Sequence, residues 1–187
     1  LYYVAPTTGQ GGSAIGVATS ASPAGPWTDS GHPLVAPEPN PYNNSFLRAV
    51  IDPDETQDAS GQRYISYGSY NGGVSIRKLS ADGLTSDPTS EQQIAIDNRF
   101  EGANFWQHDG YYYLFVSTTN CCNGPLTGSS VLVGRALTPT GPFFDKSGIP
   151  LNTFAPGGTF SIASNGNEWV GPGGNVVLED ESGQDFM

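Results

Sequence analysis

Two acidic residues, Asp52 and Glu101, stand at the same distance from a turn glycine in two separate parts of the chain. Glu101 lies nine residues before Gly110, and Asp52 lies nine residues before Gly61. A pair of carboxyl groups can cleave a glycosidic bond. One protonates the departing oxygen, and the other activates a water molecule that attacks from the opposite side. Taken alone, an Asp before Pro often caps a turn and a Glu at a strand end is usually solvated. The matched offset favours the paired, catalytic interpretation.

Residues 100–117 predict the element that carries Glu101. Two runs rich in aromatic and β-branched residues meet at Asp109-Gly110, and an Asp-Gly pair between such runs is a strong signal for a β-hairpin. Gly102 follows the acidic residue and lets the backbone pass close to another group. We therefore expect Glu101 to face a ligand or a solvent-filled cleft at the mouth of the first strand.

The same layout occurs a third time, because Gly174 lies nine residues before Gly183. In all three units an aromatic residue follows three positions after the turn glycine: Tyr64, Tyr113 and Phe186. A repeat of roughly 50 to 70 residues of short strands is typical of propeller blades. The first strands of blades surround a central axis, so we expect Asp52, Glu101 and Gly174 to meet there.

The composition predicts one all-β domain with a neutral ligand. Glycine (25) and proline (15) are abundant, and no apolar period of 3.6 residues extends beyond a turn or two. The net charge of −11 disfavours nucleic acid and anionic membranes as partners, since both require a positive surface. No apolar run reaches the length of a membrane span. We expect a monomer.

Short strands and turn residues predict four successive blades, which begin at residues 1, 48, 101 and 169. We expect the third blade to end near Ile149, and the Pro- and Asn-rich residues 37–45 to form a loop between blades. The opening blade lacks a first strand, and the last is cut short after the turn at Ser182-Gly183. These features predict that three to four blades are present and that the chain is incomplete at both ends.

The two cysteines, Cys121 and Cys122, are adjacent. They cannot join distant elements as the disulfides of small secreted domains do. Two states remain open: a disulfide between neighbours, or two buried thiols that behave as small apolar side chains.

Several short motifs follow one another along nearly the whole chain. They are residues 15–27, Ile51-Asp52-Pro53, Gly68-Ser69, Glu101-Gly102 with residues 110–114, and Gly134-Arg135 followed by residues 140–142. In this order they resemble glycoside hydrolase family 43, the five-bladed β-propellers that include arabinanases, arabinofuranosidases and β-xylosidases. The Cys121-Cys122-Asn123-Gly124 element resembles the arabinan-cleaving members most.

The resemblance implies an inverting hydrolase in which Glu101 is the general acid. Asp52 would then orient that acid and tune its pKa. The family's general base is an Asp in the first strand of the first blade, upstream of the start of this chain. Residues 1–187 would thus be a partial catalytic propeller domain, and we expect them to be inactive alone.

Gly174 departs from the family pattern, in which a histidine at this position helps to hold a central metal ion or water. The resemblance implies a central calcium or other metal ion, but the glycine argues against one here, and no other cofactor is expected. The two histidines, His32 and His108, are expected at the surface. Phe105 and Trp106 alternate between strand faces, so one of them could stack on a sugar ring; packing in the core is the alternative for both.

The function that the resemblance implies is secreted hydrolysis of α-L-arabinofuranosyl linkages in arabinan or arabinose-decorated hemicellulose. One alternative is a non-catalytic sugar-binding propeller, for which Gly174 is the support. A β-xylosidase-type member of the same family is a second alternative. A propeller that binds proteins is disfavoured, because its blades need no acidic groups at equivalent axial positions.

Overall fold

A computed structural model of the protein describes residues 1–7, 12–118, 121–166 and 168–187. Within these ranges the regular elements are β-strands, apart from one turn of 3₁₀ helix, η1 (Gly124–Leu126), which confirms the all-β class. The described part of the chain has no helix with the length and apolar character needed to cross a membrane. The strands are β1 (Tyr2–Pro6), β2 (Ser13–Thr19), β3 (Thr28–Asp29), β4 (Pro39–Asn40), β5 (Asn43–Leu47), β6 (Asp54–Gln57), β7 (Arg63–Ser69), β8 (Gly73–Leu79), β9 (Ser86–Ala95), β10 (Phe100–His108), β11 (Tyr111–Thr118), β12 (Val131–Ala136), β13 (Thr159–Ile162), β14 (Leu178–Glu179) and β15 (Asp185–Phe186).

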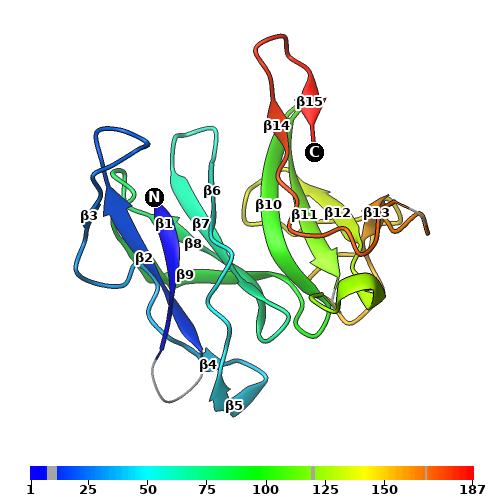
Figure 1. The fold of residues 1–187 in the computed structure, drawn as a ribbon, viewed down its shortest axis with the longest axis horizontal. Helices are drawn as coiled ribbons and strands as arrows, with labels where there is room; N and C mark the ends of the chain where they lie inside the picture. The colour runs from blue at the N-terminus through cyan, green and yellow to red at the C-terminus, as the bar shows by residue number, and fades with distance from the viewer. Residues whose placement is uncertain (8–11, 119–120, 167) are drawn as a thin grey trace.

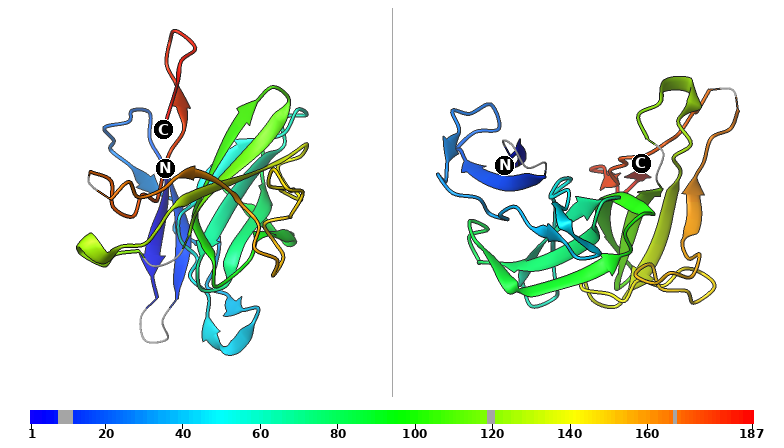
Figure 2. Two further views of the ribbon diagram at one scale, coloured as in Figure 1. Left: turned by 90° about the vertical axis from the view of Figure 1, so that its right-hand side faces the viewer. Right: turned by 90° about the horizontal axis from the view of Figure 1, so that it is seen from below.

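The strands form antiparallel sheets in which neighbours in sequence are neighbours in space. The three larger sheets have the orders β1-β2-β3, β6-β7-β8-β9 and β10-β11-β12-β13, and two hairpins, β4-β5 and β14-β15, complete the set. Figures 1 and 2 show that the sheets follow one another around an arc rather than stacking in two layers. This is the arrangement of blades around an axis that the repeat predicts.

The hairpin of β10 and β11 turns at Asp109-Gly110 as expected. Both residues are left-handed, with φ of 48° and 76°, as a type I′ turn requires. The pairing runs from His108 opposite Tyr111 to Phe100 opposite Thr118. The register shifts between Glu101 and Asn104, so a bulge lies immediately beside the acidic residue.

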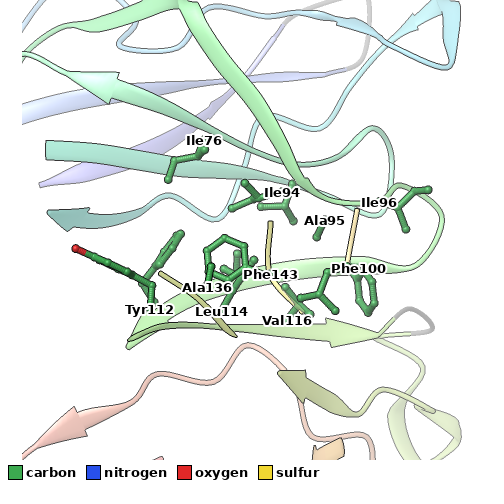
Figure 3. Close-up of a cluster of buried hydrophobic side chains, with 14 of the residues drawn as sticks. Ile76, Ile94, Ala95, Ile96, Phe100, Tyr112, Leu114, Val116, Ala136 and Phe143 are labelled. Atoms are coloured by element: carbon green, nitrogen blue, oxygen red, sulfur yellow. The ribbon is translucent and has the colours of Figure 1, made fainter. Parts of the chain in front are cut away.

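Two clusters of buried apolar side chains hold successive sheets together. In the larger one, Ile76 and Ile94 of the second sheet face Leu114 of the third, as Figure 3 shows. Phe105 and Phe143 meet there edge to face, with ring centres 5.7 Å apart. Residues of the first and second sheets form the other cluster. Each fully buried side chain of this size contributes about 1.5–3 kcal/mol, so contacts between sheets are a major source of stability.

Charged side chains are buried beside the second cluster. Arg48, with 2% of its side chain exposed, donates from Nη1 to Glu91 Oε1 at 2.8 Å. Arg77 donates from Nη2 to Glu91 Oε2 at 2.7 Å and also contacts the Glu38 carboxylate. Both guanidinium groups lie 5.3 Å from the centre of the Tyr67 ring. Two cations are thus compensated by two carboxylates, as buried charges require.

The third sheet extends further along the chain than expected. Its fourth strand is β13, which pairs with β12, so the predicted end near Ile149 is wrong. Around that position Phe144 makes only isolated bridges, to Arg135 and to Pro150. Pro142 and Pro150 lack the amide hydrogen that a continuous ladder needs, which explains why the sheet resumes only at Thr159.

The loop expected at residues 37–45 contains part of a hairpin, β4-β5, so that expectation is also wrong. The side-chain oxygen of Asn40 accepts hydrogen bonds from the backbone N–H groups of Tyr42, at 2.8 Å, and Asn43, at 3.2 Å. This local turn, of the kind that Asn and Asp side chains favour, brings the two short strands together.

Candidate active site

Asp52, Glu101 and Gly174 line one cavity of about 380 Å³. Asp52 stands just before β6, Glu101 is the second residue of β10, and Gly174 precedes β14. Residues far apart in sequence are therefore brought together by the starts of three successive sheets. The predicted convergence of these three positions is confirmed.

Asp52 is held in place by hydrogen bonds of the preceding residues to the first sheet and to its own sheet. Its backbone is left-handed, with a φ of 53°, and β6 begins only at Asp54. Two residues earlier, the backbone N–H and C=O of Val50 both bond to the Ser13 hydroxyl, at 3.0 and 2.9 Å. The carbonyl of Ile51 accepts from the Gly68 N–H at 2.8 Å. These contacts fix the backbone from which the carboxylate projects.

Gly102 allows the close approach that the sequence predicts. A Cβ atom at this position would lie 3.6 Å from the Cα of Gly174 and 3.3 Å from the hydroxyl of Ser117. Gly174 in turn donates its N–H to Ser117 Oγ at 2.8 Å. The bulge after Glu101, the backbone at Gly174 and the Ser117 hydroxyl thus form one continuous wall of the cavity.

The two carboxyl groups of the cavity influence each other. Burial raises the pKa of Asp52, and a hydrogen bond from the Gly102 N–H opposes that shift. Burial also raises the pKa of Glu101, and the negative charge of Asp52 raises it further. A carboxyl group that keeps its proton to higher pH, beside a second carboxylate, is suited to donate a proton to a bound molecule.

A third carboxylate, Asp54, lies beside the cavity and has a structural use. It accepts hydrogen bonds from the Phe105 N–H, at 2.7 Å, and from Asn104 Nδ2, at 3.3 Å. Asn104 Oδ1 accepts from the Val177 N–H at 2.9 Å. Burial raises the pKa of Asp54, and the hydrogen bond from the Phe105 N–H offsets only part of that rise. This chain of bonds ties β6 to β10 and to the segment before β14.

Neither of the two aromatic candidates lines the cavity. Phe105 is buried in the larger core cluster, so its expected alternative, packing in the core, is correct and the sugar-stacking hypothesis is wrong for this residue. Trp106 is half-buried on the other face of β10, opposite Tyr113. Its contact with a sugar stays a prediction.

The two cysteines form a disulfide with each other. Both residues are exposed, so the alternative of two buried thiols is wrong. They line the same cavity as Asp52 and Glu101, a position that their sequence neighbourhood did not indicate.

Sequence reasoning also missed the polar residues of the cavity wall, which are Ser117, Thr127 and Ser129. One signal was available for Ser117, because this polar residue ends an apolar strand and pairs with Glu101 in the hairpin. Thr127 and Ser129 lie in a connection whose course depends on contacts distant in sequence, and no local pattern marks them.

The side chains present do not fit a metal ion held by the protein at this axis. Gly174 offers no side-chain donor where the resemblance implies a histidine, and Asp54 is engaged by Phe105 and Asn104. Across the described residues, no cluster of three or more His, Cys, Asp or Glu side chains is placed to hold a metal ion. His32 and His108 are both exposed, as expected.

We expect Gly174→His to create a divalent-cation site in the full-length protein, because an imidazole could bind a metal or order its water shell. No atom lies within 4 Å of a Cβ built at Gly174, so a side chain has room. The melting temperature of the variant should rise with added divalent cation. The added stability would reach about 2.7 kcal/mol at one hundred times Kd.

Gly183→His is the matched control, because Gly183 is also left-handed with no atom near its Cβ but lies in the β14-β15 turn. This control should not respond to cations. If instead the wild-type protein lost activity in chelator and regained it with calcium, the metal ligand would come from another residue. Asn175, whose buried amide has no hydrogen-bond partner among the described residues, would be the first to test.

Comparison with known proteins gives matches along the whole chain. The family model of glycosyl hydrolases family 43 matches residues 1–187. An extracellular endo-α-(1→5)-L-arabinanase of Bacillus subtilis is 35% identical over 184 residues, which are 95% of this chain and 54% of that protein. An extracellular exo-α-(1→5)-L-arabinofuranosidase of Cellvibrio japonicus is 34% identical over 207 residues, covering 100% of this chain and 57% of that protein.

The fold matches a solved structure of Cellvibrio cellulosa α-L-arabinanase in complex with arabinohexaose. The TM-score is 0.83 at 30% identity, and the match covers 98% of this chain and 62% of that one. The chain therefore spans a little more than half the length of the relatives that it matches.

Proposed function

Because the chain belongs to glycosyl hydrolases family 43, and its described residues form three larger sheets and two hairpins, we propose that it is part of a catalytic five-bladed propeller domain. The full-length protein would cleave α-L-arabinofuranosyl linkages in arabinan or arabinose-decorated hemicellulose with inversion of configuration. The observation that carries this proposal is the pair of carboxyl groups, Asp52 and Glu101, in one cavity at the starts of successive sheets. The arabinan-cleaving activities named for the relatives support the substrate.

Glu101 is the general acid of the proposed mechanism. Its raised pKa keeps a proton available, and it donates this proton to the glycosidic oxygen as the bond to the sugar breaks. Asp52 does not touch the leaving oxygen in this proposal. Its negative charge favours the protonated form of Glu101. Its carboxylate accepts a hydrogen bond from the N–H of Gly102, the residue after Glu101, and so orients the acid.

The general base activates water on the opposite face of the sugar. We assign this role to an Asp upstream of residue 1, since Asp54 is committed to the Phe105 and Asn104 hydrogen bonds. The glycines and hydroxyl groups of the cavity wall suit a neutral, polar ligand such as an oligosaccharide. Extracellular relatives support secretion, and we propose a monomer.

The non-catalytic alternative depends on Gly174 alone. A module that only binds sugar does not need a proton donor, whereas the raised pKa of Glu101 beside Asp52 supplies one, so the enzyme is favoured. A β-xylosidase-type enzyme would use the same general acid but cleave a different sugar. Comparing substrates, as described below, separates it from an arabinan-cleaving enzyme.

The test is incubation of the full-length protein with linear 1,5-arabinan, arabinoxylan, xylan and the corresponding aryl glycosides. We expect arabinose or arabino-oligosaccharides from arabinan, and NMR during the first turnovers should show a sugar product of inverted anomeric configuration. Product length distinguishes endo from exo cleavage. Preferential cleavage of xylan would establish the xylosidase alternative, and binding of arabino-oligosaccharides without any hydrolysis would establish the binding module.

A further inference from the structure

A disulfide between adjacent residues faces the carboxylate cavity. Cys121 and Cys122 are joined, both are exposed, and both line the cavity that contains Asp52 and Glu101. The disulfide therefore borders whatever the cavity binds.

This disulfide cannot serve the usual purpose of a cross-link. The loop-closure entropy that a disulfide removes from the unfolded chain grows with the number of residues that it encloses. Cys121 and Cys122 are consecutive, so no segment is enclosed and no distant elements are joined. A direct contact with a ligand explains the pair better than stabilisation of the fold.

Apart from the disulfide, the described lining of the cavity offers little apolar surface. Among the residues that the structure describes, the rest of the wall is made of two carboxyl groups, glycines, hydroxyl groups and a single large apolar residue, Ile51, with no aromatic ring. A sugar ring has polar edges and apolar faces, and small-molecule sites combine a few polar groups with an apolar lining. Sulfur is polarizable and packs well against apolar surfaces. The disulfide supplies the apolar surface that Phe105 and Trp106, which lie outside the cavity lining, do not.

The surrounding loop holds the disulfide in position. Cys122 is left-handed, with a φ of 69°, and the next residue, Asn123, donates its N–H to Thr127 Oγ1 at 3.0 Å. The turn of η1 follows, closed by the Thr127 N–H on the Gly124 carbonyl at 3.1 Å. A Cβ at Gly171 would lie 2.2 Å from the Thr127 side chain. The segment leading to Gly174 thus packs directly on this loop.

We propose that the Cys121–Cys122 disulfide is the apolar platform on which one sugar ring of the substrate lies beside Glu101. The inference rests on the proposed function and names a binding element of that same site. The platform contacts substrate and transition state equally, so its loss raises KM and leaves kcat largely unchanged.

The test is the double variant Cys121→Ala/Cys122→Ala in the full-length protein. We expect KM for a linear arabino-oligosaccharide to rise about tenfold, with kcat within about twofold of wild type. Leu126→Ala is the matched control, because Leu126 is apolar, 75% exposed and in the same loop but outside the cavity lining. This control should keep the wild-type KM.

Reduction of the wild-type protein with a phosphine gives a second measurement that does not depend on folding of a variant. The exposed disulfide accepts two electrons and two protons to give two thiols, and KM should rise and then return on reoxidation. An unchanged KM in both experiments, with arabinan still cleaved, would overturn the platform and leave the proposed function intact. A wild-type protein that neither cleaves nor binds arabino-oligosaccharides would overturn both.

Discussion

Glu101→Gln should reduce hydrolysis of arabinan by the full-length protein about 10²- to 10⁴-fold, the usual contribution of a general acid. The departing group in arabinan is a sugar alkoxide, which needs a proton in order to leave. An activated aryl glycoside releases a stable phenolate and needs little assistance. Its hydrolysis should therefore fall far less than that of arabinan, and the ratio of the two losses identifies proton donation.

The control for this substitution is Glu179→Gln, which makes the same chemical change at an exposed position of β14. It should leave both rates unchanged. Equal losses of Glu101→Gln on the two substrates would remove the general-acid assignment, because a group that only binds or orients the sugar acts on both alike.

The pH dependence follows from the same pair. Burial is the first cause of the raised pKa of Glu101 and the charge of Asp52 is the second. A general acid works only while protonated, so activity is lost as the pH rises through the pKa of Glu101. Asp52→Asn removes the negative neighbour and lowers that pKa. The alkaline limb of the kcat/KM profile should then move to lower pH, whereas a purely structural role for Asp52 would lower the rate without moving the limb.

Arg48→Ala should lower the free energy of unfolding by about 3–5 kcal/mol, as expected when one partner of a buried ion cluster is removed. The substitution leaves Glu91 without the Nη1 contact at 2.8 Å. It also removes the Arg48 Nη2 donor to the Gly73 carbonyl, a buried contact of 2.7 Å. Urea unfolding of the wild-type and variant proteins measures the difference.

Arg135→Ala gives the comparison for Arg48. Arg135 is exposed, and its guanidinium lies 4.4 Å from the centre of the Tyr111 ring. A cation–π contact at such a site contributes about 0.5–1 kcal/mol. If Arg48→Ala lowered the free energy of unfolding no more than Arg135→Ala does, the buried cluster would have adjusted to the missing charge.

The local parts of this fold could be predicted from the sequence because turn chemistry is local. Asp109-Gly110 supplies the two left-handed residues of a type I′ turn, and alternating runs on either side supply the strands. The site could be predicted because equal offsets from the turn glycine place equivalent residues at equivalent strand starts. Asp52, Glu101 and Gly174 meet for that reason, without any long-range information.

The errors arise where one residue changes the phase of a strand or where distant segments meet. The bulge between Glu101 and Asn104 breaks the two-residue period, so counting from Glu101 could not tell which face Phe105 would take. The hydrogen bond from Gly174 to Ser117 and the packing of Gly171 on Thr127 join segments tens of residues apart. Their consequence, the disulfide in the cavity wall, could not be read from any window of sequence.

The left-handed backbone of Asp52 implies a conflict between durability and activity at this position. A non-glycine residue in this conformation costs about 1–2 kcal/mol, and burial of an ionisable group without a countercharge adds to that cost. Glycine would relieve both. A sequence selected only for resistance to unfolding would therefore replace the aspartate, and selection for thermal tolerance should drive this chain away from catalysis unless turnover is selected at the same time.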